Sequence, residues 1–152
     1  MATRTPTPTP ARRSANDPLG RLLTSALAVR QRAWAPYSKF QVGAAVLGDD
    51  GRIYAGCNVE NSSYPVCLCA ERNAIGQAVA RGARRVLAAA VVAPSERPTP
   101  PCGMCLQALS EFGNGDMPIL LATPAGAELE TTLDRLLPQR FDESYLRDVG
   151  AE

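Results

Sequence analysis

The chain has 152 residues, 45% of them hydrophobic, which is enough to bury one core without covalent cross-links. Sixteen basic and fifteen acidic side chains leave a formal net charge of +1, so we expect a small substrate and no nucleic-acid partner. Histidine is absent, which excludes Ser-His-Asp triads, Cys-His pairs and imidazole ligands. Any metal must therefore be bound through sulfur and oxygen.

The cysteines number five, an odd count with no apolar leader before them. Such a set is a poor disulfide framework, so we expect reduced thiols and a cytoplasmic protein. The longest apolar run, residues 86–93, is too short to span a bilayer, and no membrane association is expected.

The composition divides the chain into three parts. Residues 1–15 alternate threonine and proline before two arginines and bear too little apolar surface to fold, so we expect a disordered tail. Residues 16–145 are predicted to form one domain, and residues 146–152 a flexible C-terminal end.

Within the domain, helical and strand patterns follow one another. Asn16 or Asp17 before Pro18 marks a helix start, and apolar residues at helical spacing continue to Trp34. The predicted elements are a helix ending before Pro36, strands 37–47 and 52–57, helix 69–81, strand 86–92, helix 102–112, strands 117–122 and 127–131, and helix 133–137. This order predicts an α/β fold, a mixed sheet sandwiched by helices.

Two short cysteine motifs carry the chemistry, Cys69-Ala70-Glu71-Arg72 and Pro101-Cys102-Gly103-Met104-Cys105. Cys69 and Cys102 each lie where a helix is expected to begin, and Cys105 shares a helix face with Cys102. The positive ends of two helix dipoles would lower the pKa of the thiols and favour thiolates. Three thiolates with an open fourth position are the arrangement of a catalytic zinc site.

Glu71 lies in the first helical turn beside Cys69, so it can face the open position and act as a general base without binding the metal. Its alternative role is to favour the helix dipole alone. Three thiolates around Zn²⁺ leave a formal charge of minus one, and Arg72 is the neighbouring candidate for compensating it. The alternative for Arg72 is a solvated helix charge.

Two other uses of the cysteines remain open. A structural zinc site would need a fourth ligand, Cys67 or Cys57, and a redox dithiol would leave Cys69 and Glu71 without a role. Otherwise Cys57 and Cys67 are expected to be small buried residues.

The motif Cys-Ala-Glu followed by Pro-Cys-Gly-x-Cys resembles the zinc-dependent deaminase signature. Three further segments narrow the resemblance to the small homotetrameric cytidine deaminases over residues 19–141: Tyr37-Ser38-x-Phe40-x-Val42-Gly43-Ala44-Ala45, Gly56-x-Asn58-x-Glu60-Asn61-x-Ser63-Tyr64, and Leu136-Leu137-Pro138-x-x-Phe141.

The resemblance implies a cytidine-deaminase-like α/β/α sandwich around a mixed five-stranded sheet. It also implies a hydrolase of pyrimidine salvage that converts cytidine and deoxycytidine to the uridines and ammonia at a Zn²⁺ site. By resemblance, Cys69, Cys102 and Cys105 bind the metal and Glu71 moves the protons. The substrate-binding positions would be Phe40, Asn58, Glu60, Tyr64, Ala70 and Phe141. Asn58 and Glu60 would bind ribose hydroxyls, and Phe141 would come from a neighbouring subunit of a homotetramer.

One position departs from the family pattern. Leu106 stands where a basic residue usually follows the last cysteine, which affects the charge near the site or the subunit packing. A modified cytosine nucleoside such as blasticidin S is the alternative substrate, and a non-enzymatic zinc or redox module is the alternative function. For Phe40 and Phe141 the alternative is packing, and for Asn58 and Glu60 it is an ordinary polar turn.

Overall fold

The computed structural model describes residues 13–14 and 16–147. Within these residues five strands form one sheet in the order β2-β1-β3-β4-β5, in which only the central β3–β4 pair is parallel. The strands are β1 (Gly43–Gly48), β2 (Ile53–Cys57), β3 (Val86–Val92), β4 (Pro118–Ala122) and β5 (Glu128–Thr132). All five lie where the sequence predicts a strand, although β1 is shorter than predicted.

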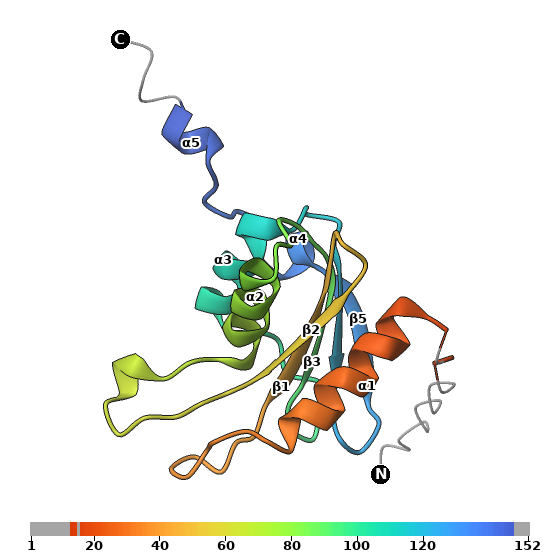
Figure 1. Cartoon of the computed structure of the whole chain (residues 1–152), viewed down its shortest axis with the longest axis vertical. Coiled ribbons are helices and arrows are strands. Elements are labelled where there is room, and N and C mark those ends of the chain that lie inside the picture. The colour runs from red at the N-terminus through yellow and green to blue at the C-terminus, as the bar shows by residue number, and fades with distance from the viewer. Residues whose placement is uncertain (1–12, 15, 148–152) are drawn as a thin grey trace, which may run out of the picture.

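Helices cover both faces of this sheet (Figure 1). Helix α1 (Pro18–Arg30) packs on one face, while α2 (Ala70–Ala80), α3 (Gly103–Phe112) and the short α4 (Leu133–Leu136) pack on the other. Two short helices, η1 (Tyr64–Val66) and α5 (Ser144–Arg147), were not predicted. The arrangement confirms the α/β/α sandwich.

The sheet separates two hydrophobic layers, and the alternating side chains of β3 enter both. Ala88 and Ala90 join α1 in one layer, and Ala89 and Val91 join α2 and α3 in the other. Small side chains let the helices lie close to the strands: a Cβ on Gly56 of β2 would be 2.5 Å from a backbone atom of α2. The position of α2, which begins next to Cys69, is thereby fixed against the sheet.

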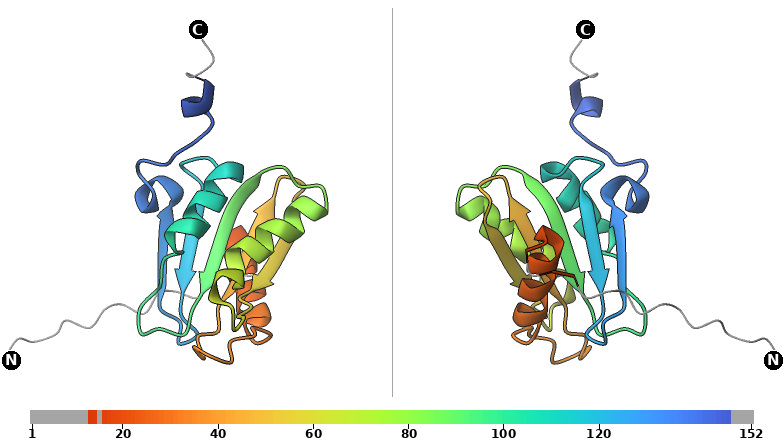
Figure 2. Two further views of the ribbon diagram at one scale, coloured as in Figure 1. Left: turned by 90° about the vertical axis from the view of Figure 1, so that its left-hand side faces the viewer. Right: turned by 90° about the vertical axis from the view of Figure 1, so that its right-hand side faces the viewer.

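The segment between α1 and β1 differs from the prediction. The helix ends at Arg30, and Trp34 pairs with the chain after β2, donating its N–H to Asn58 and accepting from the N–H of Glu60. The predicted strand from residue 37 begins only at Gly43, because side chains bind the preceding backbone N–H groups. This segment forms a loop beside the start of α2 (Figure 2).

The predicted tail, 1–15, and C-terminal end, 146–152, lie largely outside the described residues and stay predictions. Arg13 is described, and it pairs with Asp17 before α1 and with Glu128 and Glu130 on β5. Of the helices that the structure describes, none is long and apolar enough to cross a membrane.

Candidate metal centre and active site

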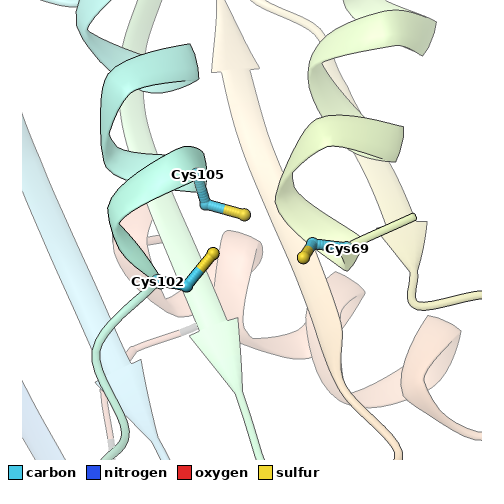
Figure 3. A group of neighbouring side chains, drawn as sticks. All are labelled: Cys69, Cys102 and Cys105. Carbon is cyan, nitrogen blue, oxygen red and sulfur yellow. The ribbon is translucent and has the colours of Figure 1, made fainter. Parts of the chain in front are cut away.

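The three predicted cysteine ligands converge between the first turns of two helices (Figure 3). Cys69 is the N-cap of α2, Cys102 is the N-cap of α3, and Cys105 lies one turn into α3. Their Sγ atoms all lie within 4.8 Å of one another. Tetrahedral zinc with Zn–S bonds of about 2.3 Å places its sulfur ligands about 3.8 Å apart, so the spacing fits the ion.

The electrostatics of the thiols favour one negative charge even without metal. A hydrogen bond from Cys105, helped by the Arg72 guanidinium, lowers the pKa of Cys69 to about 5. The same hydrogen bond and burial raise the pKa of Cys105, because it retains the proton that the pair shares. A divalent cation would replace this proton and bind both sulfurs as thiolates.

Arg72 is partly buried and interacts with the Cys69 thiol. Its Nη2 donates to the carbonyl of Cys67 at 3.0 Å, while its Nε is buried with no hydrogen-bond partner among the described residues. The negative charge of a zinc–thiolate group would stabilise this buried guanidinium. The donor set, its spacing and this cation all fit zinc, and within the described residues no fourth Cys, Asp or Glu joins the three thiols.

Glu71 follows Cys69 in the first turn of α2 and is only 5% exposed. Burial raises the pKa of its carboxyl group, and the negative charge of Cys69 adds to the effect. A buried carboxyl group with a raised pKa holds a proton more readily than an exposed one, which suits a group that both accepts and donates protons.

A cavity of about 440 Å³ opens beside the metal centre, within the size range of small-molecule sites. Four of the predicted substrate residues line it: Phe40, Asn58, Glu60 and Ala70. Glu71 also lines it. Cys69 and Cys102 also line the cavity. The other lining residues had no role assigned from the sequence, although two of them belong to the segment Tyr37-Ser38-x-Phe40-x-Val42: Ser38, Val42, Val91, Ala93, Thr99 and Pro100.

Asn58 and Glu60 hold the loop that precedes β1. Asn58 donates from Nδ2 to the carbonyl of Phe40 and accepts from the N–H of Val42, both at 2.8 Å. Glu60 accepts from the backbone N–H groups of Tyr37 and Ser38 and from the Ser38 hydroxyl, and this last bond is the main cause of its lowered pKa. The two side chains therefore order the cavity wall that they also line.

Two predicted substrate residues lie elsewhere. Tyr64 is 70% exposed and packs edge-on against Tyr37, beside a second cavity that shares Ser38 and Glu60 with the first. Phe141 is 56% exposed and stacks on Tyr145. Neither side chain lines the cavity of its own chain, so their substrate roles stay predictions.

The two remaining cysteines lie outside the thiol cluster, and Leu106 lies in the hydrophobic core. Cys67 accepts a hydrogen bond from the N–H of Asn61 at 3.2 Å, and like Cys57 it is half-buried and outside the thiol cluster. Leu106 is buried in the layer beneath α2 and α3, where an aliphatic side chain packs without a charge to solvate.

Comparison with known proteins agrees with this geometry. Residues 18–121 match the family model of the cytidine and deoxycytidylate deaminase zinc-binding region. A cytidine deaminase of Sporosarcina psychrophila is 48% identical over 126 residues, covering 83% of this chain and 93% of the relative. One of Halalkalibacterium halodurans is 43% identical over 127 residues, covering 84% and 96%. The crystal structure of cytidine deaminase from Burkholderia pseudomallei superposes with a TM-score of 0.76 at 43% identity, covering 80% of this chain and 97% of that one.

The chain belongs to the cytidine and deoxycytidylate deaminase family of zinc-binding enzymes. The predictions of a cytidine-deaminase-like fold, a deaminating hydrolase and a zinc cofactor are thereby confirmed.

Proposed function

We propose that the protein hydrolyses cytidine and deoxycytidine to uridine and deoxyuridine with release of ammonia, as in pyrimidine salvage. The observation that supports this most directly is the cavity itself. A zinc-competent thiol cluster and the buried carboxyl group of Glu71 meet there with two polar side chains, Asn58 and Glu60.

Cys69, Cys102 and Cys105 would hold the metal. When bound, zinc lowers the pKa of a water molecule and so supplies a nucleophile at neutral pH. Glu71 would take a proton from the water that attacks C4 and deliver it to N3 of the pyrimidine. It would then take the remaining proton of the hydroxyl group added at C4 and pass it to the amino nitrogen, so that the C4 carbonyl forms as the C–N bond breaks and ammonia leaves. The raised pKa of Glu71 suits a group that must both gain and lose protons.

Glu60 has a different role in this proposal, which needs a carboxylate that stays ionised. Its lowered pKa keeps the carboxylate charged, which makes it a strong acceptor for a sugar hydroxyl. Together with Asn58 it would bind the ribose, and the Phe40 ring would pack near the base. Polar groups left unpaired by free cytosine would make that base a poor substrate.

The active assembly in this proposal is a homotetramer. Tyr64 and Phe141 are large, exposed and outside their own cavity, as expected of side chains donated to a neighbouring copy. Sedimentation of the purified protein would measure the assembly. A cytoplasmic location stays a prediction, consistent with five free thiols.

A deamination panel with metal analysis of the same sample tests the function. The panel comprises cytidine, deoxycytidine, free cytosine, cytidine monophosphate and blasticidin S, followed by the loss of pyrimidine absorbance. We expect one zinc per chain and turnover of the two plain nucleosides far above that of cytosine. Preference for blasticidin S would replace the proposed substrate, and zinc without any turnover would favour the non-enzymatic module.

A further inference from the structure

Hydrogen bonds from the same chain occupy most acceptor positions of the Glu60 carboxylate. Oε2 accepts from the N–H groups of Tyr37 at 2.9 Å and Ser38 at 3.2 Å, and Oε1 accepts from the Ser38 hydroxyl. A carboxylate offers about four lone-pair directions, so one direction on Oε1 is left for a ligand. Where this lone pair points depends on the Ser38 hydroxyl, which occupies the other direction on the same oxygen.

The Ser38 hydroxyl also reaches forward along the chain, accepting from the N–H of Phe40 at 3.0 Å. Lys39 lies between them with φ at 60°, in the left-handed region that residues with a Cβ rarely adopt. Such a conformation persists where surrounding contacts fix it. One hydroxyl therefore joins the carboxylate on the cavity wall to the backbone that carries the Phe40 ring, and both ends of this link line the cavity.

The remaining contacts show that Ser38 has a separate task from Asn58. Asn58 binds the carbonyl of Phe40 and the N–H of Val42, so it holds the side of the loop nearest β1. It makes no hydrogen bond to Glu60 in the part of the chain that the structure describes. Loss of the Ser38 hydroxyl would thus leave Phe40 anchored through its carbonyl and Glu60 held through Oε2 by two backbone N–H groups, while Oε1 alone loses its partner.

We infer that Ser38 is a positioning residue that directs the free Oε1 lone pair of Glu60, and so sets the preference for nucleosides with ribose hydroxyls over those without them. The inference rests on the proposed function and adds a residue whose hydroxyl acts through Glu60. An orienting role of this kind affects binding of the sugar and leaves the proton transfers of Glu71 unchanged.

The test compares the full chain with Ser38→Ala, Ser38→Thr and the control Ser25→Ala, whose hydroxyl bonds only within α1. Each is assayed on cytidine and on 2′,3′-dideoxycytidine, which lacks both hydroxyls. In Ser38→Ala we expect KM for cytidine to rise about 10- to 100-fold, the loss typical of one hydrogen bond to a charged group. We expect kcat to stay within about threefold, because the contact with the sugar is made equally in the ground state and the transition state. The dideoxynucleoside, which lacks the hydroxyls, should be little affected. Threonine should restore the wild-type KM.

Unchanged KM in Ser38→Ala, or an equal loss on both nucleosides, would overturn the inference, since the first removes the effect and the second indicates general damage to the cavity. If the alanine variant does not fold, Ser38→Cys, a weaker donor of similar shape, should shift KM in the same direction. Calorimetric binding of the two nucleosides separates the two proposals. Wild-type protein that binds cytidine without converting it refutes the function alone, and a Ser38→Ala variant with unaltered discrimination refutes the role of Ser38.

Discussion

Replacing Gly56 by alanine should displace the helix that carries both Cys69 and Glu71. The added Cβ would lie 2.5 Å from the carbonyl oxygen of Ala70 and 2.5 Å from the nitrogen of Ala74, both backbone atoms of α2. Ordinary contact begins at 3.4 Å, so α2 must retreat by about 1 Å. Overpacking of this kind costs about 1–3 kcal/mol of unfolding free energy. A displacement of about 1 Å at the proposed catalytic groups should lower kcat/KM about 100-fold.

Gly76→Ala is the matched control, because it adds the same methyl group to α2 where no atom beyond the neighbouring residues and backbone of the helix itself lies within 4 Å. It should raise stability by about 0.5–1 kcal/mol through helix propensity and leave activity unchanged. Thermal unfolding and cytidine turnover of both variants measure the outcome, with a Tm change of about 2–4 °C per kcal/mol for a domain of this size. If Gly56→Ala matched wild type in both measurements, the proposed close packing of α2 on β2 would be refuted.

Three further predictions concern the site. Glu71→Gln should retain zinc in elemental analysis but lose about 10²–10⁴-fold in kcat, because it removes the group that moves protons, and near-wild-type turnover would contradict that role. Chelation should lower Tm and added zinc should restore it. At a free zinc concentration of 100 times Kd, the metal should add about 2.7 kcal/mol to the free energy of unfolding. An unchanged Tm would mean that the thiols hold no metal. Glu60→Gln should be less stable than wild type at neutral pH. The lowered pKa of Glu60 means that its ionised form stabilises the fold above its ordinary value of 4.5 and that this contribution is lost as the pH falls through the lowered value. The Tm gap should therefore close in acid, and a gap independent of pH would refute the assignment.

The sequence was most informative where local rules and packing agree. The apolar run of residues 86–92 coincides with β3 because a central strand is buried on both faces. The convergence of the three thiols could be predicted because their spacing from expected helix starts already places them at the first turns, and Cys69 and Cys102 are indeed N-caps.

Prediction failed where side chains distant in the chain decide the backbone. Residues 37–42 have a strand-like composition, yet Asn58 and Glu60 take up their N–H groups and hold a loop. For the same reason Ser38, Thr99 and Pro100 were not recognised as lining the cavity, since no periodicity reveals which loops meet. Tyr64 and Phe141 could be assigned only by resemblance.

The topology also orders the events of biosynthesis. Cys69 begins α2, whereas Cys102 and Cys105 belong to α3, and the whole of β3 lies between them. A growing chain on the ribosome therefore exposes one thiol long before its two partners emerge. If the three thiols hold zinc as proposed, complete coordination requires that the central strand and the first turn of α3 have been synthesised, so the metal would tie together segments from both halves of the chain.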